Sequence, residues 1–398
     1  MGVAEQLTRG RSIVRGRIDV LLVTLLVVLL GVDLLGQLVG GALGFPFLAS
    51  VFLEGLVVGL AYGLAGIGLS MTYSILNFAN FAHGDTVTVG AFAGWSTAYV
   101  LGGLGTAGGG RLFLLGGSPS ISVLSAFGVV VIGALTAGAS GAALSLALDR
   151  VVYRPMRSAD GISLLIASIG VALGLRYLIA FVYGTDVRGV TAPVSKLGLF
   201  RLEGVTGIGL IRPGQRVGEL AGAGELPFFL PVGAGGTGSE VLVSLTLHGV
   251  ALAIAASGLM LGVHLLLQRT KLGTAMRAMA DNKPLARVTG IPTERVIRAT
   301  WIVGGALTGI AGFLIVLERG TMSFTFGWLL LLFIFSAVIL GGIGSIYGAM
   351  AGGIIIGLVD SMAIIWLPSS LTKAAAFAVL ILVLIVRPDG LFGGVTTA

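Results

Sequence analysis

Residues 70–90 read SMTYSILNFANFAHGDTVTVG and lie between two strongly apolar segments. Four polar side chains stand in this stretch, namely Asn77, Asn80, His83 and Asp85. A carboxylate at the centre of a bilayer costs roughly 2.5 to 3.5 kcal/mol on insertion scales, so it usually lines a path, forms a pair or lies just outside the hydrocarbon. The stretch is therefore the leading candidate for a functional site.

The composition excludes an ordinary soluble protein. Apolar residues make up 56% of the chain and charged residues 10%, with a mean hydropathy of +1.05, whereas soluble domains carry about 25% charged residues. Apolar runs of about 20 residues recur along the chain, as expected for helices that cross a hydrocarbon core roughly 30 Å thick. We therefore expect an all-α, polytopic membrane protein in which residues 1–398 form one transmembrane domain.

Apolar runs between charged and glycine-proline breaks predict ten spans. They lie near residues 18–40, 48–76, 84–102, 121–148, 161–183, 242–267, 298–318, 326–345, 347–367 and 371–387. Most of the 24 basic residues fall on one side of this arrangement, and short cytoplasmic loops carry an excess of Lys and Arg. This bias predicts that both termini are cytoplasmic.

Cysteine and charge usage narrow the possible chemistry. The chain has no cysteine and only three histidines, which excludes disulfides, thiolate nucleophiles and cysteine metal sites. We expect neither a metal site nor a cofactor bound by this chain. The formal charge of +7 follows the predicted topology, so it does not indicate a nucleic-acid partner.

Two connections are longer than the others. The outer one, 184–241, is rich in glycine, proline and mixed charge, which predicts a partly ordered external cap. The inner one, 268–297, predicts a pair of short cytoplasmic helices, because Asn282 can cap a second helix, Pro284 fits its first turn and Gly290 its end. A solvated connector held against the lipid headgroups by its basic residues remains an alternative for this loop.

Four motifs in order along the chain carry a family resemblance. They are NFANFAHGD at 77–85, LGTAMRAMADNKPLARVTGIP at 272–292, GGIGSIYGAMAGG at 341–353 and RPDGLFG at 387–393. With them the sequence resembles permease subunits of the branched-chain amino-acid class of ABC importers. The similarity runs from about residue 50 to the C-terminus, without most of the 184–241 loop, and the asparagine-rich motif is similar to that of the first of two permease types.

The resemblance implies a transmembrane subunit, not an enzyme, in the plasma (inner) membrane of a prokaryote. It implies a second permease subunit, two cytoplasmic ABC ATPases that bind ATP and magnesium, and an external substrate-binding protein. Leucine, isoleucine or valine are the implied substrates, with urea or short amides as the alternative. With ten spans, the implied architecture is that of the larger, vitamin-B12-importer-like ABC importers.

The lysines agree with ATP hydrolysis on partner subunits. An ATPase phosphate loop requires a lysine directly after a glycine. The four lysines of this chain follow Ser195, Thr270, Asn282 and Thr372. The chain therefore contains no Walker A motif, and any energy from ATP must come from a partner.

The inner loop resembles the ATPase-coupling loop of ABC importers. In that loop a Glu-Ala-Ala pattern is followed after three residues by glycine, and Ala286 and Gly290 keep this spacing, while Pro284 and Leu285 replace the glutamate and first alanine. Small residues at 286 and 290 would let a helix fit closely into a partner's cleft. Arg277 and Arg287 could pair with acidic groups on the rim of that cleft. The residues predicted to couple to the ATPase are Arg277, Asp281, Pro284, Ala286, Arg287 and Gly290.

The intramembrane polar residues have two open interpretations. As a translocation path or gate, Asn77, Asn80, His83 and Asp85 would break the helix and offer hydrogen bonds, with Asp360 as a further path residue. As a structural network, they would fix neighbouring helices, and His83 is then a hydrogen-bonded residue rather than a metal ligand. Asp360 and Glu54 are also possible partners for Arg176 inside the fifth span.

Two other classes of membrane protein are alternatives to a permease subunit. In a stand-alone secondary transporter or channel, intramembrane acids such as Asp85 or Asp360 would couple protons. The cytoplasmic helix pair argues against that class. An intramembrane protease is disfavoured because the chain lacks the rhomboid-type Gly-x-Ser-Gly sequence and the residues before Asp85 are Ala82, His83 and Gly84.

Overall fold

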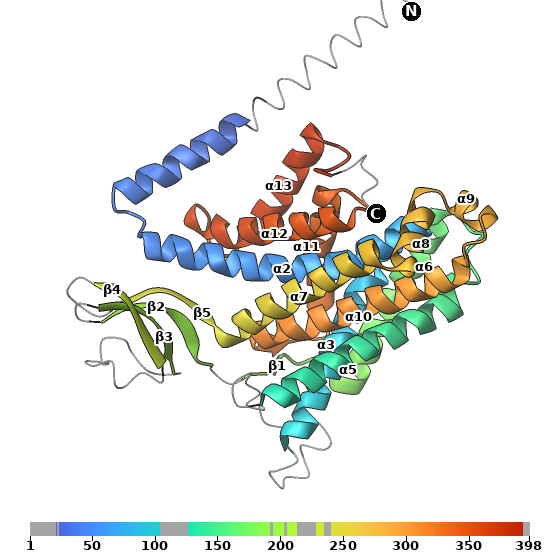
Figure 1. Cartoon of the computed structure of the whole chain (residues 1–398), viewed down its shortest axis with the longest axis horizontal. Helices are drawn as coiled ribbons and strands as arrows, with labels where there is room; N and C mark the ends of the chain where they lie inside the picture. The colour runs from blue at the N-terminus through green and yellow to red at the C-terminus, as the bar shows by residue number, and fades with distance from the viewer. Residues whose placement is uncertain are drawn as a thin grey trace, which may run out of the picture.

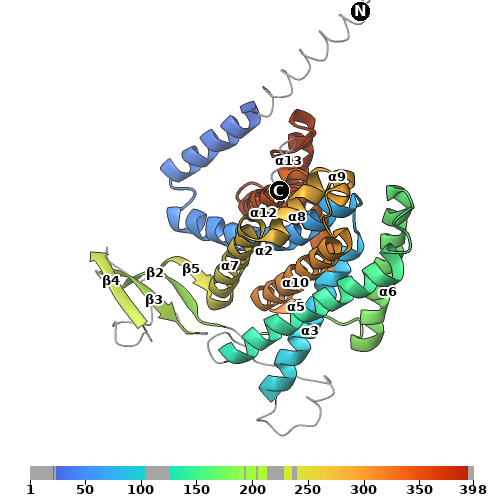
Figure 2. The same cartoon turned by 45° about the vertical axis from the view of Figure 1, so that its right-hand side comes forward.

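The structure is a computed structural model of the chain. It describes residues 21, 24–103, 126–191, 194–202, 205–212, 228–234 and 240–392. The first residues of the predicted spans 18–40 and 121–148 and the last residue of the RPDGLFG motif lie outside these ranges. Helices form most of the described chain, and a small sheet lies at one end of the bundle, away from α8 and α9 (Figures 1 and 2).

Each of the ten predicted spans coincides with a helix. These helices are Thr24–Val39, α2 (Phe45–Leu76), α3 (Ala82–Gly103), α5 (Phe127–Leu148), α6 (Gly161–Tyr183), α7 (Leu247–Arg269), α10 (Thr293–Arg319), α11 (Phe326–Gly341), α12 (Ile346–Met362) and α13 (Thr372–Val386). By length and apolar composition, six of the described helices are able to cross a membrane, namely α2, α5, α6, α7, α10 and α12 with their short extensions. The fold is therefore that of a polytopic helical membrane protein.

The predicted external cap contains a sheet. Its four antiparallel strands are β2 (Lys196–Leu202), β3 (Val205–Ile211), β4 (Phe228–Ala234) and β5 (Glu240–Thr246), in the order β4-β3-β2-β5. The expectation of an all-α chain was wrong here, and the predicted span 242–267 begins only at Leu247, where Thr246 accepts a hydrogen bond from the backbone of Gly249. A two-stranded ribbon joins β1 (Arg188–Gly189) to β6 (Thr321–Met322).

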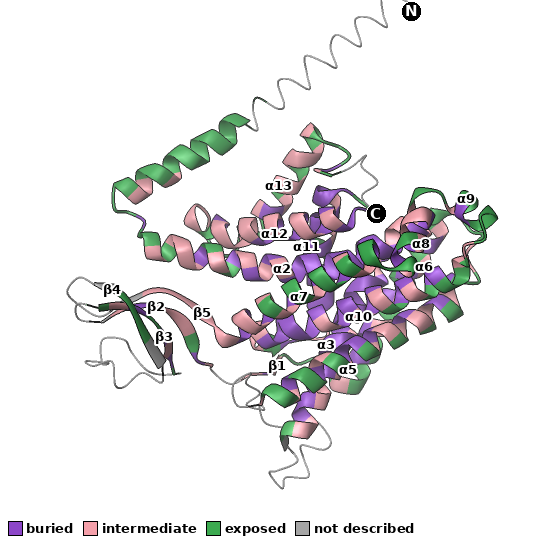
Figure 3. Ribbon diagram, viewed as in Figure 1, coloured by how far each residue is buried: buried purple, intermediate pink, exposed green. Residues whose placement is uncertain are grey.

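Small residues set the closest helix contacts of the bundle. A Cβ atom on Gly59 of α2 would lie 2.7 Å from the Cα atom of Ile354 on α12, and one on Gly84 of α3 would lie 2.6 Å from the carbonyl oxygen of Gly327 on α11. Close approach of this kind drives helix association in lipid, where apolar burial gives little advantage. The buried residues follow α2, α10 and α11 (Figure 3), whereas α6 buries only five of its 23 residues.

Candidate functional site: a broken helix and a helix pair

The polar stretch 77–85 forms a break between α2 and α3. Helix α2 ends at Leu76, and Asn77 adopts a left-handed conformation with φ of +56°, the one positive φ of a non-glycine residue in the described chain. Asparagine tolerates this conformation better than most residues. Helix α3 then starts at Ala82, so the helix break predicted from the sequence is present.

Side chains of the break itself and of α6 satisfy the backbone amides of the break. The Asn80 side-chain oxygen accepts hydrogen bonds from the Ala82 amide at 3.1 Å and from the Tyr153 hydroxyl at 3.0 Å. The Phe81 amide donates to the Ser168 hydroxyl of α6 at 3.0 Å. Irregular backbone inside a membrane protein is tolerated only where protein or a polar cavity surrounds it. Asn80, with 3% of its surface exposed, meets that condition.

His83 is buried just inside α3. Its Nε2 atom lies 3.0 Å from the carbonyl oxygen of Ala65 on α2 and 3.4 Å from the Thr308 hydroxyl on α10. A carbonyl only accepts hydrogen bonds, so Nε2 carries a proton and donates it. Within the part of the chain that the structure describes, no group of three His, Cys, Asp or Glu side chains could hold a metal ion. His83 thus joins three helices by hydrogen bonding.

Asp85 forms a buried ion pair with Arg176. The Arg176 Nε and Nη2 atoms donate to the two carboxylate oxygens at 3.2 and 3.0 Å, and Asp85 is fully buried. The guanidinium carbon also lies 4.6 Å from the centre of the Trp328 ring on α11. Two-point pairing of this kind fixes both side chains. The sequence pointed to Asp360 or Glu54 as partners of Arg176; the structure assigns that place to Asp85.

Asp360 belongs to a different polar group. Its carboxylate accepts a hydrogen bond from the Tyr62 hydroxyl at 3.4 Å, and Arg319 donates to the same hydroxyl at 3.3 Å. The Tyr62 ring stacks on Phe333 with the ring centres 5.2 Å apart. Arg319 ends α10 beside the β1–β6 ribbon. Asp360 therefore bonds a different set of side chains from Asn80, His83 and Asp85.

The inner connection contains the predicted helix pair. Helix α8 spans Lys271–Asp281 and α9 spans Lys283–Val288 (Figure 1). The Asn282 side chain accepts a hydrogen bond from the Leu285 amide at 2.9 Å, which confirms the predicted cap. Gly290 follows α9 with φ of +86°, a conformation that favours glycine and ends the helix.

The exposed face of α9 differs from the one expected. Ala286 is only 3% exposed and packs on the chain's own core, so the expectation that it fits into a partner's cleft was wrong. Leu285 and Val288 are 59% and 85% exposed instead. The remaining coupling candidates lie on the same two helices and the turn after them; Asp281, Pro284, Arg287 and Gly290 are exposed, and Arg277 is half-buried and donates to Gln268 at 3.2 Å.

Comparisons with known proteins identify the family of the chain. The model of a family described as "Branched-chain amino acid transport system / permease component" matches residues 51–386. The chain belongs to this family. The permease protein LivH of the Escherichia coli K12 high-affinity branched-chain amino acid transport system is 28% identical over 347 residues, which cover 87% of this chain and 96% of LivH. No solved structure matches the chain.

Two further permeases extend the comparison. BraD of Pseudomonas aeruginosa, a permease protein of the same named kind of system, is 28% identical over 341 residues, covering 85% of this chain and 94% of BraD. A probable LivH of Methanocaldococcus jannaschii is 37% identical over 142 residues, covering 34% of this chain and 45% of that protein. The family resemblance drawn from the four motifs is thereby confirmed.

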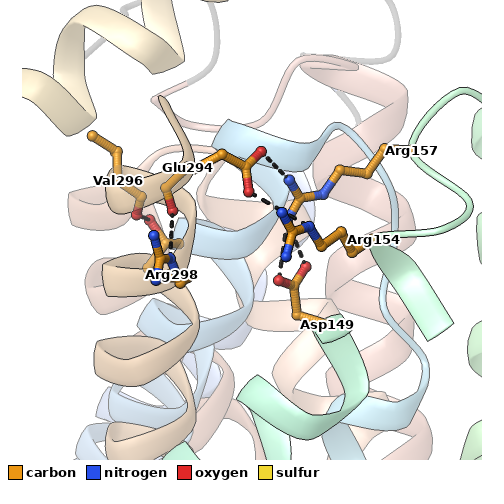
Figure 4. Close-up of polar contacts among 7 residues, drawn as sticks. Asp149, Arg154, Arg157, Glu294, Val296 and Arg298 are labelled. Carbon is orange, nitrogen blue, oxygen red and sulfur yellow. Dashed lines mark hydrogen bonds and ion pairs between the residues drawn. The ribbon is translucent and has the colours of Figure 1, made fainter. Parts of the chain in front are cut away.

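The permease also contains an ion cluster beside the helix pair that was not predicted from the sequence. Arg157 donates to both carboxylate oxygens of Asp149 at 2.9 and 3.0 Å and also pairs with Glu294, while Arg154 lies 3.8 Å from Glu294 (Figure 4). Burial lowers the pKa of Lys283 at the start of α9, and the Arg157 charge lowers it further against the opposing effect of Glu294. The one sequence signal for the cluster was an acid, Glu294, in the first turn of α10.

Replacement of Arg176 tests the buried ion pair. Arg176→Gln leaves the Asp85 carboxylate buried without its partner, and removing one member of a buried pair costs about 3–5 kcal/mol. We expect a clearly lower melting temperature in detergent than for the double variant Asp85→Asn/Arg176→Gln, which removes both charges. Thermal denaturation followed by size-exclusion chromatography measures the difference. Equal melting temperatures for the single and double variants would contradict the pairing.

Proposed function

We propose that this chain is the membrane-spanning permease subunit of an ATP-driven importer of leucine, isoleucine and valine. The observation that carries the proposal is the match to the branched-chain amino-acid permease family over residues 51–386. Two named relatives that align with more than four-fifths of this chain, LivH and BraD, belong to high-affinity branched-chain amino acid transport systems. Urea or a short amide is the alternative substrate class.

The ATPase contact is assigned to α8 and α9. The exposed apolar side chains Leu285 and Val288 offer a partner a surface that costs little to desolvate. Arg287 beside them is exposed and would pair with acidic groups of the partner. In this proposal two ATPases bind the ATP and magnesium, a second permease subunit completes the membrane part, and an external protein delivers the substrate.

The topology follows from the same assignment. With α8 and α9 in the cytoplasm, the four-stranded sheet lies on the external side of the membrane. The binding protein then docks on that side. The ten helices then all span, with both termini in the cytoplasm, in the arrangement of the larger ABC importers. The shorter helices Phe326–Gly341 and Thr372–Val386 cross as partners of longer ones, because a short helix is accommodated by local thinning of the bilayer.

The polar group around Tyr62 suits the ammonium and carboxylate groups of an amino acid. Asp360 and Arg319 carry opposite charges and share one hydroxyl rather than a direct ion pair. A zwitterionic amino acid can offer its ammonium group to the carboxylate and its carboxylate to the guanidinium. In this proposal the substrate passes this group on the sheet side before it reaches the break at Asn77–Asp85.

Reconstitution tests the proposed function. The chain is co-expressed with the second permease and the ATPases of its system, and the complex is placed in liposomes with the binding protein. We expect ATP-dependent uptake of radiolabelled leucine that unlabelled isoleucine or valine inhibits. Uptake by the chain alone without ATP would make it a secondary transporter or channel, and uptake of urea in place of leucine would change the substrate class.

A single charge on α9 tests the ATPase contact. Val288→Arg places a charge in the proposed apolar interface, so we expect at least a tenfold loss of co-purified ATPase, equivalent to about 1.4 kcal/mol. Val187→Arg, at a 70% exposed position near the sheet end, is the matched control and should co-purify normally. Quantitative immunoblotting of the purified complexes measures both. Undiminished ATPase recovery with Val288→Arg would refute the assigned contact.

Asp360→Asn tests the proposed path. The variant keeps the size of the side chain but removes the charge offered to the substrate ammonium, so leucine uptake at saturating binding protein should fall about fivefold, or roughly 1 kcal/mol. Tyr62→Phe is the control for a structural role, because it removes the shared hydrogen bonds and leaves both charges. Wild-type uptake by Asp360→Asn, or an equal loss in both variants, would reject the assignment.

A further inference from the structure

The end of α5 contains a turn of unusual geometry. Residues Asp149–Tyr153 form a π-helical turn, closed by a 2.6 Å hydrogen bond from the Arg154 amide to the Asp149 carbonyl. Single π turns within helices occur frequently at functional sites. This turn is buried at both of its ends, with Asp149 4% and Tyr153 1% exposed, and the two side chains contact different parts of the permease.

At one end, Asp149 connects the turn to the helix pair. Arg157 forms two hydrogen bonds to the Asp149 carboxylate and a third to Glu294 (Figure 4). The Arg157 and Asp149 side chains are 22% and 6% exposed, so solvent screens this part of the cluster less than a surface pair. Glu294 is the second residue of α10 and follows α9 by a short connection. The cluster is therefore anchored at the start of α10, at the end of the connection from α9.

At the other end, Tyr153 connects the turn to the broken helix. Its hydroxyl donates to the Asn80 side-chain oxygen that also accepts from the Ala82 amide at the start of α3. The Tyr153 ring stacks on Trp301 of α10, with ring centres 5.3 Å apart and planes 4° apart, and contacts Phe78 at 5.1 Å. Tyr153 thus touches the break on both sides of Ala79.

We propose that the π turn Asp149–Tyr153 is the positioning element that transmits motion of α8 and α9 to the 77–81 segment. Motion reaches the turn through the ion pairs of Glu294, Arg157 and Asp149. It reaches the broken helix through the Tyr153–Asn80 hydrogen bond. The inference rests on the proposed ATPase contact at α9. Its residues act through neighbouring side chains and are positioning residues, since none of them is assigned to the substrate.

Two features of the turn favour transmission of motion over a purely structural role. Asp149, the acid that Arg157 holds in the cluster, and Tyr153 lie on one turn, five residues long, so a shift of Asp149 is passed to the Tyr153 hydroxyl through a single turn of backbone. The stack on Trp301 also holds Tyr153 to α10, the helix that carries Glu294. The ion pairs and the ring stack therefore both connect the turn to α10. Coupling between sites is carried by packed and hydrogen-bonded elements of this kind.

Paired transport and ATPase measurements test the route in the reconstituted complex. Tyr153→Phe removes the hydroxyl but keeps the stacked ring, and Glu294→Gln removes the charge but leaves Arg157 on Asp149. Each variant should lower leucine uptake at least about fivefold, the lower range of coupling energies between sites, while ATP hydrolysis stays within about twofold. Leucine uptake by the double variant should be no lower than uptake by the more impaired single variant, because both changes interrupt one route.

Arg154→Gln is the matched control. Arg154 is 59% exposed on its side chain and lies 3.8 Å from Glu294, so the variant removes an arginine from the same loop without touching the Arg157 pairs. We expect uptake within about twofold of the wild type, as for an exposed ion pair. If Arg154→Gln lowers uptake as much as Glu294→Gln, the loss reflects loop charge, and the proposal is wrong.

A conformational readout separates transmission from stability. Because the chain has no cysteine, Ala79→Cys places its single thiol in the broken segment, and maleimide labelling is compared with and without ATP. We expect an ATP-dependent labelling rate that Tyr153→Phe and Glu294→Gln abolish. A rate that ignores ATP in the otherwise wild-type chain, or that still responds in both variants, overturns the inference. Absence of ATP-driven leucine uptake by the wild-type complex would instead overturn the proposed function.

Discussion

The constraint on which the site depends is that every backbone polar group of the α2–α3 break needs a partner inside the protein. An unsatisfied amide or carbonyl in hydrocarbon costs several kcal/mol, and the break leaves the Phe81 and Ala82 amides outside regular helix bonding. Ser168 of α6 accepts from the first and the Asn80 side chain from the second. Because Asn80 also bonds Tyr153, helices α3, α5 and α6 are fixed relative to the break.

The buried ion pair follows from the same break. Starting α3 inside the bundle puts Asp85 into its first turn, where a carboxylate without a partner would be costly. Arg176 provides that partner from α6, a helix that buries only five of its 23 residues. A buried pair adds little net stability, because desolvation offsets the attraction, yet breaking it is expensive. The pair therefore fixes the position of α6 against α3 and α11 more than it stabilises the fold.

The helices and the cap of α9 could be predicted from the sequence because each depends on a local pattern of residues. The helices were predictable because apolar runs of membrane length are unambiguous, and Asn282 marked the start of α9 through its capping chemistry. The sheet was missed because Gly198 and Gly209 interrupt the alternation of its strands; Gly198 packs against the backbone of β5 too closely for any side chain. The Arg157–Glu294 pair joins residues 137 positions apart, and no local pattern encodes such a contact.

Ala286 packs α9 on the bundle, although its motif suggested a contact with a partner. Its spacing to Gly290 suggested a residue small enough to fit a partner's cleft, whereas the structure buries it against the permease's own core. A small side chain there lets α9 pack closely on the bundle, which turns Leu285 and Val288 outward. A partner that pushes on those two residues would meet a helix backed by packed side chains, and packed interiors transmit displacement instead of absorbing it. The internal packing of α9 is therefore what would make its exposed face useful for coupling.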